Sequence, residues 1–223
     1  MATDGSIPDW WEREQARRKR VEQNRLDAKP LEEAIRKLGV DISSLDDLVN
    51  RNFDYKIAVP LLLDWLPRVQ NQDVKSAIVR ALTVKFAKPE AAKPLLKEFM
   101  QAQVSSGGDI KWVIGNALSV VADDSVFDEL VALLRDRRHG RDREMLAWAL
   151  GNMKNPRAAD VLIEMLDDEQ VAGHAIAPLG KLKAIRAKGR LEQFLNHPKA
   201  WIRKAAKTAL ARISKAEHVQ TRK

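Results

Sequence analysis

The sequence predicts an all-α fold in which similar helix pairs stack into a solenoid. A leucine recurs at the same place in a segment of roughly 30 residues, and a period in that range is typical of helical repeat arrays. The recurring residues are Leu82, Leu118, Leu150, Leu179 and Leu210. A second leucine-rich helix lies between successive leucines and completes each unit. Aromatic residues make up only 5% of the chain, with a single tyrosine, which disfavours a β fold.

The first part of the chain is expected to be helical and partly exposed. Residues 1–28 combine Trp10 and Trp11 with a strongly charged stretch of helix-forming residues. This composition favours an exposed helix or a tail that orders on contact. Residues 29–54 are expected to form a helical cap of two short helices, the first ending at Gly39.

About five helix pairs are predicted over residues 55–214, followed by a basic tail at 215–223. The outer helices read AVPLLLDWL, AAKPLLKEFM, FDELVALL, ADVLIEML and GRLEQFL, and the inner helices read VKSAIVRALTVKF, IKWVIGNALSVVA, REMLAWALGNM, GHAIAPLGKL and IRKAAKTALARI. Counting about 100° per residue from each recurring leucine places the residues four and eight positions upstream on the core side, except Asp142. The aligned pairs of the outer helices, such as Phe99 with Met100, are also expected in the core. The motif SSGGD at 105–109 predicts a loop.

The segments WALGNMKNPRAADVLIEMLDD and PLGKLKAIRAKGRLEQFL resemble the short HEAT-like repeats of bacterial type that are named after phycobilisome lyases. The resemblance covers about residues 55–214. It implies a right-handed α-solenoid whose inner helices line a concave surface, used mostly as a protein-binding scaffold. Lys75, Lys111, Arg143 and Arg203 match the arginine ladder of HEAT repeats, whereas Ala172 departs from it. In this family the ladder is more often structural than ligand-binding.

No catalytic residue, metal site or cofactor is predicted. The chain contains no cysteine, no phosphate-binding loop and no His-Glu pair of the kind that holds a di-iron centre, and its four histidines fall in different repeat positions. The acidic pairs Asp123–Asp124 and Asp167–Asp168 could hold a cation weakly but are more simply helix caps. Asn116 stands where HEAT-like DNA glycosylases use an aspartate. We therefore expect a protein that acts by binding.

The inner helices carry the candidate binding residues. Their side opposite the core is small and polar, with four glycines, except for Trp112 and Trp148. These rings are expected either to wall a groove for a protein or peptide segment, or to be covered by neighbouring helices or a dimer contact. Basic residues at the rim would favour an acidic ligand. The expected partner-binding residues are Trp112, Trp148, Asn116, Arg80, Lys111 and Arg143.

The C-terminal part of the chain is basic and suggests nucleic-acid binding as the alternative function. Of a net charge of +8, residues 180–223 hold 13 Lys or Arg against two Glu. A solvated polar cap on the last repeat explains this excess of positive charge equally well. In the alternative, the excess charge binds an acidic partner or nucleic acid. The residues of the alternative are Lys181, Lys183, Arg186, Lys188, Arg190, Lys199, Arg203, Lys204 and Lys207.

The longest apolar runs are far shorter than the roughly 20 residues that a membrane span needs. The N-terminal stretch lacks the apolar segment of a secretory signal. We therefore expect no membrane partner and a cytoplasmic location.

Overall fold

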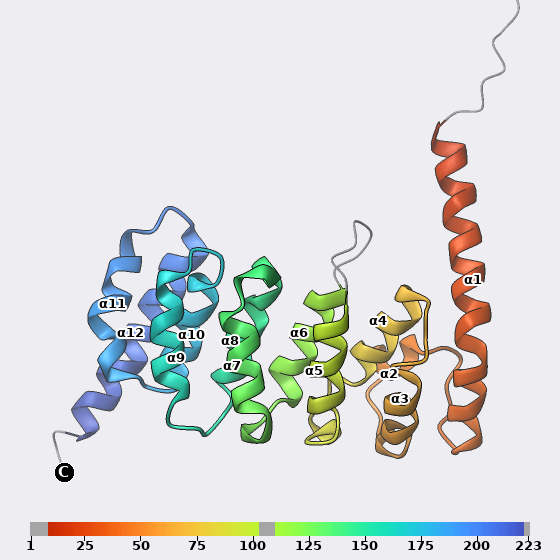
Figure 1. Cartoon of the computed structure of the whole chain (residues 1–223), viewed down its shortest axis with the longest axis horizontal. Coiled ribbons are helices and arrows are strands. Elements are labelled where there is room, and N and C mark those ends of the chain that lie inside the picture. The colour runs from red at the N-terminus through yellow and green to blue at the C-terminus, as the bar shows by residue number, and fades with distance from the viewer. Residues whose placement is uncertain (1–8, 103–109, 221–223) are drawn as a thin grey trace, which may run out of the picture. The chain divides into compact units, whose positions relative to one another are not determined.

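The computed structural model describes residues 9–102 and 110–220 of the 223-residue chain (Figure 1), without the side chains of the last two of these residues. In that part the chain forms helices and no strands. The predicted loop at 105–109 lies outside the described residues. The α-helices are α1 (Asp9–Lys37), α2 (Asp46–Asn50), α3 (Val59–Trp65), α4 (Gln72–Ala81), α5 (Ala92–Gln101), α6 (Ile110–Val121), α7 (Phe127–Arg135), α8 (Glu144–Leu150), α9 (Ala158–Glu164), α10 (Ala172–Lys181), α11 (Lys188–Glu192) and α12 (Ala200–Gln220). Short 3-10 segments lie at Lys56–Ala58, Lys85–Ala87, Asp124–Val126, Arg137–Arg143, Met165–Asp167, Ile185–Ala187 and Gln193–Asn196.

The fold is an α-solenoid with helix pairs at the expected places, and the chain divides into two compact units. One unit ends at Ala81 and the other begins at Leu82. The first unit holds α1, α2 and the pair α3/α4. The second unit holds the pairs α5/α6, α7/α8, α9/α10 and α11/α12.

In the first unit, α1 is one continuous helix that passes through the expected boundary at residue 28 and contains Pro30. Its last part is held by burial of Ala28, Leu31 and Ile35 on one face, whereas the residues before Ala28 are exposed or half-exposed. Pro30 removes one backbone donor and is itself exposed, so that water can satisfy the carbonyl left without a partner. Burial on both sides of the proline therefore outweighs its tendency to end a helix.

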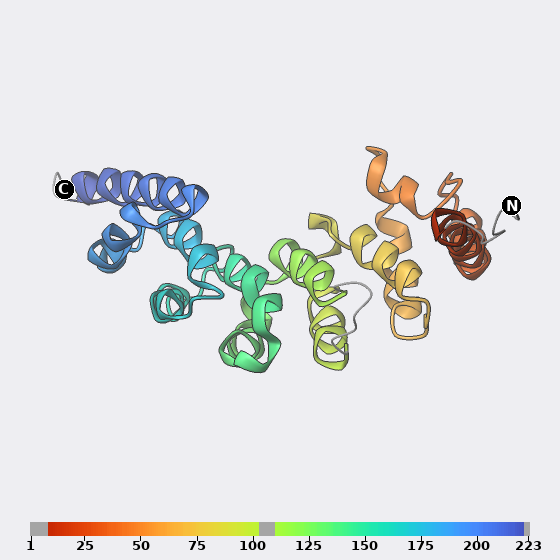
Figure 2. The same ribbon diagram turned by 90° about the horizontal axis from the view of Figure 1, so that it is seen from above.

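The second unit has two rows of helices. Figure 2 shows α6, α8, α10 and α12 side by side in one row and α5, α7, α9 and α11 in the other. We call the first row the inner helices and their exposed surface the inner face. The recurring leucines up to Leu179 are fully buried, as are Ile114 and Leu146 one turn earlier, so the predicted core face of these helices is confirmed. Leu210 in α12 is half-buried.

Four residues of the aligned outer-helix pairs that were expected in the core are not fully buried: Trp65, Phe194 and Leu195 are half-buried, and Met100 is exposed. Met100 at the end of α5 is 55% exposed, whereas its aligned neighbour Phe99 is fully buried. The expectation for Met100 was wrong: Met100 points about 100° away from Phe99 around α5, and at this place only Phe99 reaches the core, whereas both residues of the equivalent pairs Leu133–Leu134 and Met165–Leu166 are buried.

The C-terminal helix α12 runs on to Gln220, past the expected start of a tail at residue 215. None of the helices in the described residues is long and apolar enough to cross a membrane.

Candidate functional site

Two tryptophans lie exposed on adjacent inner helices. Trp112 in α6 is 47% exposed and Trp148 in α8 is 40% exposed, so neighbouring helices do not cover them. The opposite sides of these helices carry the fully buried Leu118 and Leu150, and this burial fixes the rotation of each helix. The rings therefore face solvent as a consequence of core packing, at a cost in apolar burial that a bound partner would recover.

An asparagine follows each tryptophan by one helical turn, on the same side of its helix. The amide of Asn152, in the turn after α8, donates to the carbonyl of Ser119 in α6 at 2.5 Å and accepts from the Lys181 ammonium in α10. The half-buried amide of Asn116 makes no side-chain hydrogen bond within residues 9–102 and 110–220. Asn116 thus offers a donor and an acceptor beside Trp112.

A buried carboxylate and a histidine lie next to the tryptophans. Glu144, one turn before Trp148, is 7% exposed. Its Oε1 accepts from Arg141 Nε at 2.9 Å, and its Oε2 lies 3.6 Å from His174 Nε2 in α10. Burial lowers the pKa of His174, and the charge of Glu144 offsets this only in part. The imidazole is therefore neutral at pH 7.

A third exposed tryptophan, Trp201 of α12, belongs to the same face and was missed in the sequence. It is 47% exposed, and its ring lies against His174 with centroids 5.2 Å apart. It covers Gly173: a Cβ built there would lie 2.4 Å from the Trp201 Cη2. Trp201 stands nine residues before Leu210, at a position that the other inner helices do not use for an aromatic residue. The signal that could have found it was the missing side chain at position 173.

The inner-helix glycines are buried and provide close helix contact instead of a groove floor. A Cβ at Gly151 would lie 2.6 Å from the Cβ of Pro178, and one at Gly180 would lie 2.5 Å from the Cα of Ala209. Glycine is needed at these two positions because the next inner helix approaches too closely for any side chain.

Two expected rim residues are buried, and the expectation of a basic rim is corrected. Lys111 is 7% exposed, with its Nζ 3.2 Å from His139 Nδ1 and above the ring of Phe99. Arg143 is fully buried and donates to the Asp168 carboxylate at 2.7 Å and to the carbonyl of Leu134 at 2.9 Å. Both long side chains find their partners in the interior, as the structural interpretation of the ladder requires. Arg80 is exposed on α4 of the first unit.

The basic residues of the nucleic-acid alternative divide into two groups. Those of α11 and the segment before it are paired: Arg186 with Asp160 at 2.6 Å, Lys188 with Glu217 at 2.7 Å, and Arg190 with Asp167. Arg203 donates to the carbonyls of His197 and Pro198, and Lys181 to Asn152. Four lysines are exposed and form no ion pair among the described residues: Lys183, Lys199, Lys204 and Lys207.

The acidic pairs in the loops act as caps and links. Asp123 accepts from the backbone N–H of Ser125 at 3.0 Å, and Asp124 from those of Lys154 and Asn155 in the next repeat at 2.9 and 3.1 Å. In the part of the chain that the structure describes, no group of three or more acidic or histidine side chains is placed to hold a metal ion.

Comparison with known proteins gives the class of repeat. A family model described as HEAT repeats matches residues 102–172. No curated protein matches the chain. One similar solved structure is a designed armadillo repeat protein, 18% identical, covering 81% of this chain and 92% of that chain with a TM-score of 0.49. Another is a designed armadillo repeat protein in complex with the peptide (KR)4, 20% identical, covering 87% of this chain and 98% of that chain with a TM-score of 0.50.

The family match supports HEAT-like repeats over residues 102–172, and the second structural likeness supports the α-solenoid fold. At 20% identity the structural likeness concerns the fold alone. The bacterial, phycobilisome-lyase type of the repeats stays a prediction.

Proposed function

We propose that this protein is a non-catalytic scaffold that binds an extended protein segment on the inner face of its second unit. The observation that carries the proposal is the exposure of Trp112 and Trp148 on adjacent inner helices. Exposed tryptophans on a rigid, repeated surface are the side chains that most often dominate binding energy at protein interfaces.

The polar group beside Trp112 favours a peptide chain as ligand. The Asn116 side chain presents one carbonyl oxygen and one NH₂ group, which match the N–H and C=O of a peptide unit. A chain in extended conformation exposes those groups and alternates its side chains, so that apolar side chains can reach the two rings while the backbone meets Asn116. The peptide held by the designed armadillo repeat protein of similar fold supports this class of ligand.

The experiment is selection of peptides from a random display library, followed by NMR of the protein with ¹⁵N-labelled tryptophan. The chain has six tryptophans, each with one indole N–H. We expect selected peptides to shift the indole signals of Trp112 and Trp148 and to leave that of the half-buried Trp65 in the first unit unchanged. Trp112→Ala with Trp148→Ala should abolish binding while helicity and the midpoint of thermal unfolding stay nearly unchanged.

A matched control is Met100→Ala, which removes an equally exposed apolar side chain from the outer helix α5. Selected peptides that bind wild type and the double alanine variant with equal affinity would disprove the proposed function. The same conclusion would follow if Met100→Ala weakened binding as much as the double variant.

A further inference from the structure

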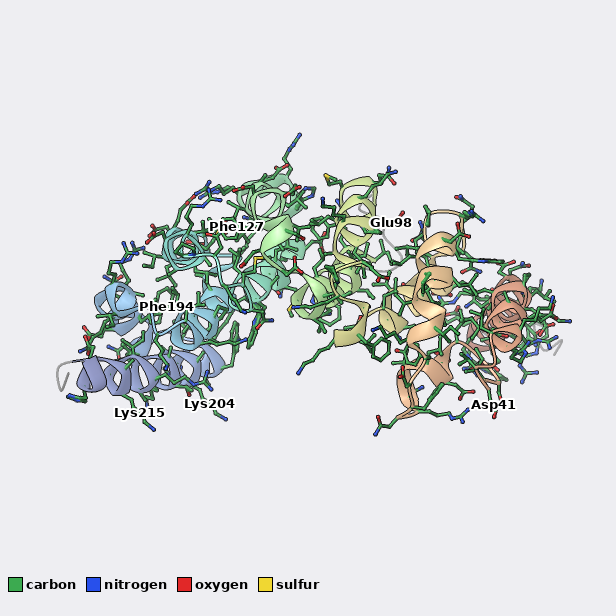
Figure 3. All side chains as sticks on the ribbon, turned by 90° about the horizontal axis from the view of Figure 1, so that it is seen from below. Asp41, Glu98, Phe127, Phe194, Lys204 and Lys215 are labelled. Carbon is green, nitrogen blue, oxygen red and sulfur yellow. The ribbon has the colours of Figure 1, made fainter. Side chains whose placement is uncertain are left out.

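The exposed side of α12 carries a row of uncompensated positive charge that begins at Trp201. Trp201, Lys204, Thr208, Arg212 and Lys215 follow one another at spacings of three and four residues, so they share one face of the helix, and all five are exposed. We call this row the α12 strip. At about 1.5 Å per residue it is about 21 Å long. Figure 3 shows Lys204 and Lys215 projecting from the same side of α12, away from the neighbouring helices.

The cations of the α12 strip differ from those of the adjacent outer helix. Each basic side chain of α11 is paired with a carboxylate, as with Lys188 and Glu217. Lys204, Arg212 and Lys215 form no ion pair within the described residues. The uncompensated charge in this region is therefore concentrated on α12, together with the lysines of the preceding loops.

Trp201 joins the α12 strip to the inner face. Its ring contacts His174 and covers Gly173, both in α10, and α10 lies between α12 and the helix of Trp148. His174 is neutral, and the nearby Glu144 is buried and bonded to Arg141. No exposed carboxylate of this cluster thus opposes an anion at the Trp201 end of the strip.

We infer that the α12 strip binds an acidic flank of the protein segment held by Trp112 and Trp148. This inference rests on the proposed function and adds the charge of the ligand. An extended chain rises about 3.3 Å per residue, so six or so residues span the strip. Carboxylates along that stretch meet three cations, and an apolar side chain can pack on Trp201.

The basic side chains of α11 are already paired with carboxylates, which favours a peptide over nucleic acid as the ligand of the α12 strip. A longer polyanion would have to extend its phosphate contacts beyond one helix. Beyond the strip it would meet Asp160, Asp167 and, on α12 itself, Glu217, each of which already neutralises a basic side chain. The length and charge of the α12 strip by itself fit a short acidic stretch of a peptide.

The test uses the full-length protein with fluorescein-labelled deca-glutamate, deca-glutamine and single-stranded (dT)10, followed by fluorescence anisotropy at about 50 and about 200 mM salt. We expect deca-glutamate to bind, deca-glutamine not to bind, and deca-glutamate to shift the indole signal of Trp201. Lys204→Glu with Lys215→Glu should weaken deca-glutamate binding at least about tenfold. Lys93→Glu with Lys97→Glu makes the same charge change on exposed positions of outer helix α5 and should alter the affinity less than about twofold.

Any of three results with the model ligands would overturn the inference: no binding of deca-glutamate, equal weakening by both double variants, or tighter binding of (dT)10 than of deca-glutamate with loss in Lys204→Glu/Lys215→Glu. The last result would assign the strip to nucleic acid. Library-selected peptides could shift the indole signals of Trp112 and Trp148 and still bind the α12 double variant as tightly as wild type. That result would support the proposed function and contradict the inferred binding of an acidic flank by the α12 strip. Loss of binding on mutating Trp112 and Trp148 is a separate readout, so failure of the inference can be distinguished from failure of the proposed function.

Discussion

The indole of Trp201 occupies the space that a side chain at position 173 would need. The built Cβ of Gly173 lies 2.4 Å from Cη2 and 3.1 Å from Cζ2 of that ring, and 3.0 Å from Cδ1 of Ile202. Glycine costs up to about 1 kcal/mol relative to alanine in a helix, and Gly173 is the second residue of α10, so here close contact between α10 and α12 outweighs helix propensity. The contact with Gly173 therefore holds the half-exposed Trp201 ring in place.

Gly173→Ala is expected to destabilise the protein although alanine favours helix. The added methyl group has to displace the Trp201 ring, and overpacking of this kind costs about 1–3 kcal/mol, against about 1 kcal/mol gained in helix propensity. Urea unfolding measures the net loss, and the Trp201 indole signal should shift. Gly189→Ala in α11 is the control, because a Cβ there meets nothing within 4 Å and should not destabilise. If both alanine variants were equally stable, the contact with Trp201 would not be the reason for glycine at 173.

Arg143→Met is expected to cost about 3–5 kcal/mol in the free energy of unfolding. The arginine side chain is 1% exposed and its partner Asp168 is 9% exposed, so the substitution leaves a buried carboxylate with only the more distant, exposed Arg137, whose Nε lies 3.7 Å away. Burial alone would raise the pKa of Asp168, yet the hydrogen bond and charge of Arg143 outweigh it and the pKa is lowered. Denaturant unfolding at pH 7 gives the cost.

Arg135→Met is the matched control for that substitution. The Arg135–Glu164 pair has the same chemistry, but both side chains are about half exposed. Its loss should cost no more than about 1 kcal/mol. Equal costs for the two variants would mean that the interior placement of Arg143 contributes nothing, contrary to the structure.

Stability is expected to fall as the pH drops from 7 to 5, in part through His174. Burial, together with the charges of Arg141 and Lys199, lowers the folded-state pKa of this histidine, and Glu144 opposes the shift without reversing it. The unfolded state, with a pKa near 6.5, then binds the proton more tightly. The contribution is complete above about pH 6.5 and is lost as the pH falls towards the folded-state pKa. His174→Gln should flatten the measured slope, and a slope equal to that of wild type would contradict the assignment.

The repeats and their core could be predicted from the sequence, because the spacing of apolar residues within one helix indicates which of its sides is buried. Ile114 and Leu146 fall on the predicted side for that reason. The sequence was not sufficient for Lys111 and Arg143. Whether a long basic side chain lies outside or inside depends on partners elsewhere in the chain, and Asp168 lies 25 residues after Arg143. Trp201 was missed for a related reason, because its exposure depends on the space that Gly173 leaves in the preceding inner helix.

The N-terminal half of α1 should contribute little to stability. Its charged residues pair within the helix, as in Arg17 and Arg18 with Glu14, each at 2.9 Å, and the side chains are exposed or half-exposed. The first polar contacts with the rest of the unit come later: Arg20 and Asn24 meet Asp73, and Asn71 donates to Asn24 and Asp27. Deleting residues 1–19 should therefore change the free energy of unfolding by less than about 0.5 kcal/mol.

Asn71→Ala, by contrast, is expected to cost about 1–3 kcal/mol. It removes the donor at 2.9 Å from Asn24 Oδ1 and 2.7 Å from Asp27 Oδ2, and also the acceptor for the backbone N–H groups of Asp73 and Val74 at the start of α4. Amide hydrogen exchange separates the two regions of α1: slow exchange is expected at Leu31 and Ile35, which are fully buried, and fast exchange before Arg20. Slow exchange throughout α1, or a truncation as costly as Asn71→Ala, would show that the N-terminal half packs against something in solution. Trp10 and Trp11 would then be the first residues to substitute.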